Sequence, residues 1–82
     1  MVKGNEIRKA LGKTVRQLRL DQNISQEKLA ELGSLDRSYI SEIENGDKTA
    51  SIITVYKIAL ALEVKPSQLM QEMEKHFEFN KD

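Results

Sequence analysis

Apolar residues recur three or four positions apart in the first quarter of the chain, which is the spacing of one face of a helix. The residues of this face are Ile7, Leu11, Val15 and Leu18. We therefore predict a helix from about Glu6 to Asp21, with Asn5 as its N-cap. Gly12 lies inside this helix, where glycine costs about 1 kcal/mol relative to alanine. It indicates either a close contact with another helix or a locally weak helix.

A second, shorter amphipathic segment follows. Ser25 is a good N-cap residue, and a carboxylate lies in the turn after it, where the helix dipole favours negative charge. Gly33 is expected to end this helix. Its apolar residues Leu29, Ala30 and Leu32 are expected to face inward.

A third helix is predicted after Asp36, which suits the N-cap position. Ile40 and Ile43 are three residues apart and form its buried stripe. Asn45 and Gly46 are expected to end it, since both tolerate a left-handed backbone. The other side of this helix is polar.

Two more helices complete the pattern. Ser51 caps a fourth helix, IITVYKIALAL, which runs to Leu62 and is so uniformly apolar that we expect it to be covered on two sides, by the core and by a partner subunit. Pro66 begins a fifth helix, which reaches about Phe77. One face of it carries Leu69, Met70, Met73 and Phe77. No segment has a strand pattern, so we predict an all-α fold of five helices in one domain spanning residues 1–82.

Composition narrows the classes of function. The chain contains no cysteine and only one histidine, His76, which excludes a disulfide framework and most zinc sites. No nucleophile, base and orienting group recur at an interpretable spacing, so we expect neither an enzyme nor a cofactor. No apolar run approaches the roughly 18 residues of a membrane span, and the first residues show no leader pattern, so we expect a cytoplasmic protein.

Charge is balanced but unevenly placed. Thirteen basic residues offset thirteen acidic residues, yet residues 1–20 sum to +5 and residues 21–82 to −5. Zero net charge argues against a nucleic-acid partner, whereas this uneven distribution still allows one basic face to meet phosphates.

The segment of residues 25–45 carries the strongest functional signal. Two short helices joined by a tight turn, the second with a polar face, are typical of a helix-turn-helix, in which the second helix enters the major groove of DNA. Ala30 is small enough for the point where the two helices meet. The apolar residues expected behind the second helix are Leu29, Leu35, Ile40 and Ile43.

Residues from about Leu11 to Met70 resemble the Xre/Cro family, the lambda-repressor-like DNA-binding domains. The matching segments are VRQLRLDQNISQEKLAE, SYISEIENG and SIITVYKIALALEV. LDRSYISEIENG and the short length look most like the controller proteins of restriction–modification systems. Two positions depart from the family pattern: Ser34 stands where glycine is frequent, and Ala50 stands where proline is frequent before the fourth helix.

The resemblance implies roles for individual residues. Arg37 and Ser38 match positions that meet base edges, and Arg37 could bind guanine O6 and N7 with two hydrogen bonds. Gln26 matches a glutamine that touches a phosphate and braces the reading helix. Tyr39 matches a contact near the groove edge or packs on the domain surface, and Glu42 faces bases or acts indirectly. The expected DNA-contacting residues are Ser25, Gln26, Arg37, Ser38, Tyr39, Ser41, Glu42, Asn45, Lys48 and Thr49.

Two further sets of residues have expected structural roles. Arg19 and Glu44 match a buried ion pair between the first and third helices, which would fix the orientation of the third. The expected dimer interface consists of Tyr56, Leu69, Met70, Met73 and Phe77, although core packing alone would explain Leu69.

The sequence therefore predicts a homodimeric, sequence-specific transcriptional regulator that binds double-stranded DNA at a palindromic operator and controls a restriction–modification operon. We expect no small-molecule ligand, no metal and no membrane partner. An antitoxin-type protein that neutralises a toxin is the alternative, favoured by the zero net charge and the acidic C-terminal part.

Overall fold

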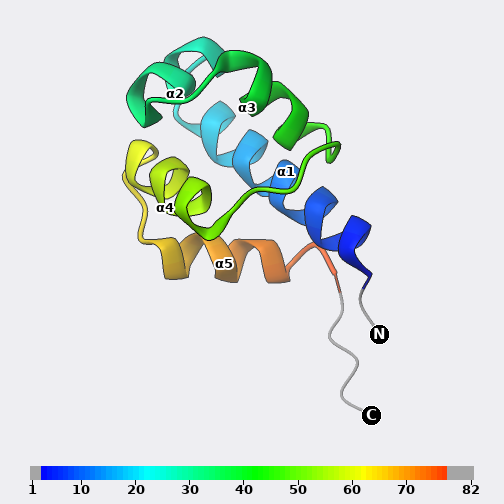
Figure 1. Cartoon of the computed structure of the whole chain (residues 1–82). Helices are drawn as coiled ribbons and strands as arrows, with labels where there is room; N and C mark the ends of the chain where they lie inside the picture. Colours follow the sequence, from blue (N-terminus) through cyan, green and yellow to red (C-terminus); the bar gives the residue numbers. More distant parts are fainter. Residues whose placement is uncertain (1–2, 78–82) are drawn as a thin grey trace.

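The described part of the chain, residues 3–77 of a computed structural model, forms five helices and no strand (Figure 1). The all-α prediction is thereby confirmed for this range. The helices are α1 (Gly4–Asp21), α2 (Gln26–Gly33), α3 (Arg37–Glu44), α4 (Ile52–Ala61) and α5 (Pro66–Glu74).

The start of α1 differs from the prediction. The helix begins at Gly4, two residues earlier than expected, because the Lys3 carbonyl accepts hydrogen bonds from the Glu6 and Ile7 amides at 3.0 and 3.2 Å. Asn5 lies within the first turn and is not the N-cap, so that prediction was wrong. Lys3 occupies the cap position without a side-chain cap.

The predicted N-cap serines of α2 and α4 make the expected capping hydrogen bonds. Ser25 Oγ accepts the Lys28 amide at 2.9 Å, and Ser51 Oγ accepts the Thr54 amide at 3.1 Å. Each bond satisfies one of the amides that a helix start leaves unpaired. Asp36 precedes α3 as predicted, but its side chain makes no capping bond.

The turn between α2 and α3 contains a serine in a left-handed conformation. Ser34 has φ 54° and ψ 48°, a region that costs a non-glycine residue roughly 1–2 kcal/mol. The Ser34 amide donates to the Glu31 carbonyl at 3.3 Å, and the Leu35 amide donates to the Ala30 carbonyl at 2.8 Å. These bonds hold the left-handed turn although serine replaces the usual glycine.

All five helices contribute to one core. Helix α1 packs against α3 on one side and α5 on the other, while α4 connects α2 to α5 (Figure 1). The hydrophobic side chains with no exposed surface are Val15, Leu29, Ile40, Ile43, Ile58, Ala59, Leu62 and Leu69. Leu32 was predicted to face inward, but it is 50 % exposed because it lies at the edge of an open groove between α2 and α4.

The predicted dimer residues on α5 divide into two groups. Leu69 is fully buried and Met73 is 8 % exposed, so both belong to the core of the single chain and the prediction that they form a dimer interface was wrong. They lie four residues apart on the face that packs on α1 and α4. Met70 is about 100° away around the helix and is exposed, and Phe77 is half-buried against the core beyond the end of α5.

Gly12 marks the closest approach of two helices. A Cβ atom added there would lie 2.4 Å from the Ile43 carbonyl oxygen and 2.6 Å from the Glu44 carbonyl oxygen. Of the two interpretations of this glycine, close packing is therefore correct. At this contact the C-terminal end of α3 packs directly on the backbone of α1.

Candidate nucleic-acid interface

Helix α3 has one buried and one exposed side. Ile40 and Ile43 are fully buried and point into the core. Ser38 and Ser41 lie on the opposite side, because residues three or four positions apart share a helix face. The short polar side chains of this ridge leave room for another molecule to approach the backbone of α3.

The first turn of α3 presents the predicted reading residues at the surface. Arg37 and Ser38 are both exposed. Arg37 forms no ion pair with any residue in the range 3–77. The donors of its guanidinium therefore remain available for an acceptor outside the subunit, and their planar fork suits two parallel hydrogen bonds.

A buried ion pair holds the other end of α3. Arg19 Nε and Nη2 donate to the two carboxylate oxygens of Glu44 at 2.7 and 3.0 Å, as the sequence predicted. The Glu44 side chain is only 1 % exposed. Hydrogen bonding to Glu44 raises the pKa of Arg19 above its ordinary value, although burial acts against this, so the guanidinium stays charged.

The ion pair is extended by two further hydrogen bonds. Gln26 Nε2 donates to Glu44 Oε1 at 3.1 Å, and Arg19 Nη1 donates to the Ile24 carbonyl at 2.9 Å. One carboxylate thus links α1, the first residue of α2 and the last residue of α3. The predicted bracing role of Gln26 is present in this geometry.

The remaining candidate residues lie on both flanks of α3. Tyr39 is half-buried against the core, and its hydroxyl donates to the Thr49 carbonyl at 3.4 Å, which ties α3 to the α3–α4 loop. Asn45, Lys48 and Thr49 are exposed at the end of α3 and in that loop. Glu42 is half-buried.

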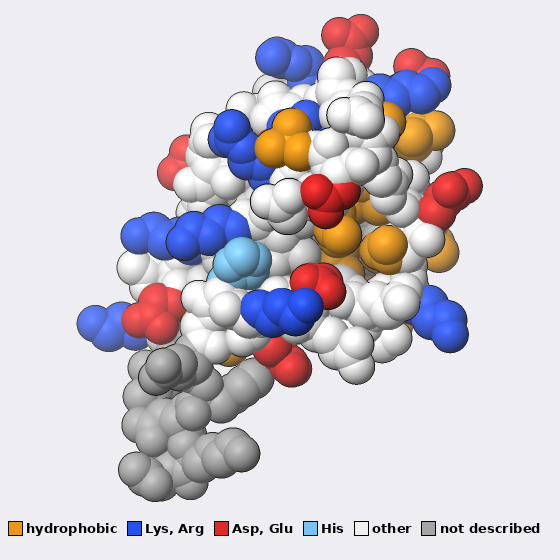
Figure 2. Space-filling model, turned by 180° about the vertical axis from the view of Figure 1, so that it is seen from behind, with side chains coloured by type: hydrophobic (Ala, Val, Ile, Leu, Met, Phe, Trp, Pro, Cys, Tyr) orange, Lys and Arg blue, Asp and Glu red, His pale blue; other side chains and the backbone are white. Residues whose placement is uncertain are grey.

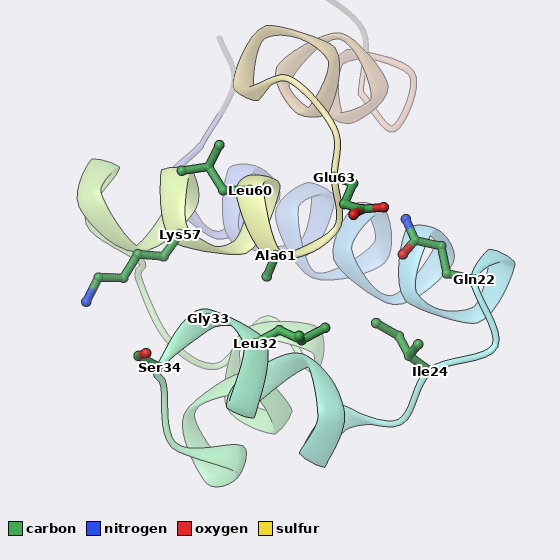
Figure 3. A pocket seen from close by; sticks show the side chains of 9 residues that line it. All are labelled: Gln22, Ile24, Leu32, Gly33, Ser34, Lys57, Leu60, Ala61 and Glu63. Atoms are coloured by element: carbon green, nitrogen blue, oxygen red, sulfur yellow. The ribbon is translucent and has the colours of Figure 1, made fainter.

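An open groove lies beside this unit, between α2 and α4 (Figure 3). It encloses about 640 Å³, and the side chains of Ile24 and Leu32 point toward one another across it. Gln22 Nε2 closes one end by donating to the Leu62 carbonyl at 2.6 Å. Its ionisable lining residues are Lys57 and Glu63 alone, so it offers no set of groups for acid–base chemistry.

Exposed apolar residues gather on α4, where sequence analysis had named only Tyr56. Ile53 and Leu60 are each 66 % exposed, Ile52 is 58 % exposed and Tyr56 is 51 % exposed. The uniformly apolar sequence of this helix indicated a second covered side but could not show which residues form it. These four residues form the part of α4 that turns away from the core.

Among residues 3–77, no group of three or more acidic, histidine or cysteine side chains is arranged to hold a metal ion. Within the same range, no helix has the length and apolar character needed to cross a membrane.

A helix-turn-helix family model matches residues 15–69, a range that includes all of α2, α3 and α4. The chain belongs to the helix-turn-helix family of DNA-binding transcriptional regulators. This confirms the family predicted from the sequence. The proteins of this family are regulators and not enzymes.

Several relatives of this helix-turn-helix chain are named as control proteins, and some of them as those of restriction–modification systems. Control protein C.BamHI of Bacillus amyloliquefaciens is 48% identical over 67 residues, which cover 80% of this chain and 83% of that protein. The structure of the controller protein C.AhdI from Aeromonas hydrophila is 39% identical with a TM-score of 0.74, over 76% of this chain and 94% of that one. The C.Esp1396I tetramer, solved in complex with its natural 35 base-pair operator, is 28% identical with a TM-score of 0.80, over 85% and 92%.

Proposed function

We propose that this protein is a sequence-specific DNA-binding regulator that acts in the cytoplasm as a homodimer on a palindromic operator and controls a restriction–modification operon. The observation that carries the proposal is the construction of α3. Its exposed ridge holds Arg37 and Ser38, while its far end is fixed by the buried pair of Arg19 and Glu44. A reading helix needs this combination of free polar side chains and a fixed orientation.

Binding to DNA would use the two helices differently. Helix α3 lies in the major groove, where the Arg37 guanidinium can donate two hydrogen bonds to one guanine. Helix α2 crosses the sugar–phosphate backbone of the DNA, so that Ser25 and Gln26 at the start of the helix lie next to a phosphate. The exposed residues Asn45, Lys48 and Thr49 hold the phosphates on the other side of α3.

The exposed apolar side of α4 supports a homodimer. Four apolar side chains in water on one short helix are unfavourable, and a second copy can cover them through a two-fold axis. Met70 on α5 adds to the exposed apolar surface. Two-fold symmetry would require a palindromic operator with half-sites about one helical turn (~34 Å) apart.

Control of a restriction–modification operon is supported by the relatives. C.AhdI is named as a restriction–modification controller protein, C.BamHI is named as a control protein, and C.Esp1396I was solved on its natural operator. A neighbouring endonuclease or methyltransferase gene is expected beside the gene of this chain, and neither would be present if it regulates something else.

Selection of bound sites from random DNA, followed by a gel shift, tests the function. The wild-type protein should enrich a palindrome, and Arg37→Ala should lose about 1–3 kcal/mol of discrimination at one base pair of each half-site. Lys57→Ala, which removes an exposed cation from α4, is the control and should keep the preference. Unchanged preference in Arg37→Ala would remove Arg37 from the reading residues. If the wild-type protein has no affinity for DNA even at low salt, the proposed function is wrong. That result would favour the alternative of an antitoxin that binds a toxin.

A further inference from the structure

The helix-turn-helix of this protein is acidic. Residues 25–49 contain three basic side chains and six acidic ones, a net charge of −3. Glu44 is neutralised in the buried pair with Arg19. The basic side chains are Lys28, Arg37 and Lys48. Lys28 lies 3.5 Å from Glu31 on α2, which partly offsets its charge. A surface of this kind attracts DNA phosphates weakly, so the positive charge needed for binding must come from elsewhere in the subunit.

Helix α1 carries the positive charge that the helix-turn-helix lacks. It contains five basic and two acidic residues, a net charge of +3 over Gly4–Asp21. Arg19 is used in the buried ion pair, whereas Lys9, Lys13 and Arg16 are exposed and form no ion pair with the described residues 3–77. In the view of Figure 2, the left side, which is the side of the N-terminal half of α1, carries several Lys and Arg side chains with acidic side chains between them.

The packing of α1 places part of this charge next to the phosphate-gripping loop. Gly46 has φ 78°, and a Cβ atom built on it would lie 3.1 Å from Lys9 Cγ and 3.4 Å from Lys9 Cα. The α3–α4 loop therefore begins in contact with Lys9. Asn45 and Lys48, which lie near Gly46 and which we propose to contact phosphates, are exposed.

Helix geometry separates the three exposed cations of α1, which are Lys9, Lys13 and Arg16. Gly12 defines the line along which α1 touches α3. At 3.6 residues per turn, Arg16 is about 40° and Lys9 about 60° from that line, whereas Lys13 is about 100° from it. Lys9 and Arg16 therefore lie on the α3 side of the exposed face, and Lys13 points further away.

We propose that Lys9 and Arg16 of α1 form a phosphate-binding row in addition to the α3–α4 loop. This row contacts the DNA backbone next to the DNA strand that the loop binds. It supplies the affinity for DNA that the acidic helix-turn-helix lacks. Nothing in this row reads bases, so it sets affinity and salt dependence and leaves sequence preference to α3. The inference rests on the proposed function, since it needs operator DNA to be bound through α3.

The test measures operator affinity over a series of salt concentrations. Each phosphate contact contributes about 0.9 to the slope of log K against log salt, so Lys9→Gln/Arg16→Gln should make the slope shallower by about 1.8 per bound subunit. The ratio of affinities for the operator and for a base-substituted operator should stay unchanged. Both residues are exposed, so the variant should melt at the wild-type temperature in circular dichroism.

A second variant that loses the same amount of charge distinguishes direct phosphate contacts from the overall electrostatic attraction between protein and DNA. Lys13→Gln/Lys75→Gln removes the same two charges, one from α1 and one from beyond the end of α5, and should change the slope by less than half as much. The exchange Lys9→Arg/Arg16→Lys keeps both charges and should keep the wild-type slope. An unchanged slope in Lys9→Gln/Arg16→Gln, or an equal change in the charge-matched variant, would overturn the proposal. In both cases the wild-type protein still binds its operator, so the proposed function stands; loss of wild-type binding itself would be the separate failure of that function.

Discussion

At the scale of single residues, Glu44 determines both the stability of the subunit and the direction of α3. Its carboxylate accepts from Arg19 and Gln26 and has almost no contact with water. A buried carboxylate of this kind is favourable only while its partners remain, because desolvation is repaid by those hydrogen bonds. The same atoms that hold α3 in place therefore make the fold sensitive to substitution.

Glu44→Ala should lower the free energy of unfolding by about 3–5 kcal/mol, because Arg19 is left buried without a counter-charge. Urea denaturation followed by circular dichroism measures this loss. Glu72→Ala, which breaks an exposed pair with Lys75, is the control and should cost about 0.2–1 kcal/mol. Replacing both partners, as in Arg19→Met/Glu44→Met, should cost less than Glu44→Ala alone. Equal losses for Glu44→Ala and Glu72→Ala would show that the buried pair does not act in this way.

At the scale of helices, the crossing of α1 and α3 depends on the absence of one side chain. Gly12 lets backbone meet backbone, so the distance between the two helices is smaller than any other residue would allow. The cost of glycine inside a helix is thereby offset by contact between the helices. The position of α3 relative to the rest of the subunit follows from this contact together with the Arg19–Glu44 pair.

Gly12→Ala should destabilise the protein by about 1–3 kcal/mol, although alanine favours helices, because its Cβ would overlap two backbone carbonyl oxygens that cannot move independently. Thermal unfolding measures the effect. Gly4→Ala is the matched control on the same helix, where the added carbon meets only a flexible arginine atom at 3.9 Å. That variant should be as stable as the wild type or slightly more so. A neutral Gly12→Ala would mean that α3 can move away from α1 without loss.

The helices themselves could be predicted from the sequence because their signals are local. The spacing of Ile40 and Ile43, and the serines at positions 25 and 51, depend only on neighbouring residues. The sequence could not decide between the two interpretations of Gly12, since the close contact involves a carbonyl more than thirty residues away.

The candidate site was predictable to a different extent. Resemblance to a family supplied the candidate DNA-reading residues, which stay a prediction, and the Arg19–Glu44 pair, which is present as an ion pair in the structure. The positive charge of the N-terminal part was evident from the sequence, but the sequence could not single out Lys9, since Lys9 meets the α3–α4 loop only through the tertiary fold. The α5 stripe was found by its spacing, but spacing could not tell that the core covers Met73 and leaves Met70 exposed.

At the scale of the whole molecule, the exposed side of α4 predicts how two subunits assemble. Ile53 is 66 % exposed in the single subunit, so Ile53→Glu should fold normally. In a two-fold interface the substitution places a charge in an apolar contact twice, once from each subunit. The variant should therefore sediment as a monomer at concentrations where the wild-type protein is a dimer.

Loss of the dimer should also weaken binding to the full palindrome. Two linked reading helices gain roughly 10²- to 10⁴-fold in avidity over one, so Ile53→Glu should bind the full operator little better than a half-site. Leu20→Glu, an equally drastic change at a 47 % exposed leucine on α1, is the control and should remain dimeric. A dimeric Ile53→Glu would exclude this side of α4 as the interface. A monomeric Leu20→Glu would move the interface to α1, where it would compete with the phosphate-binding row for the same surface.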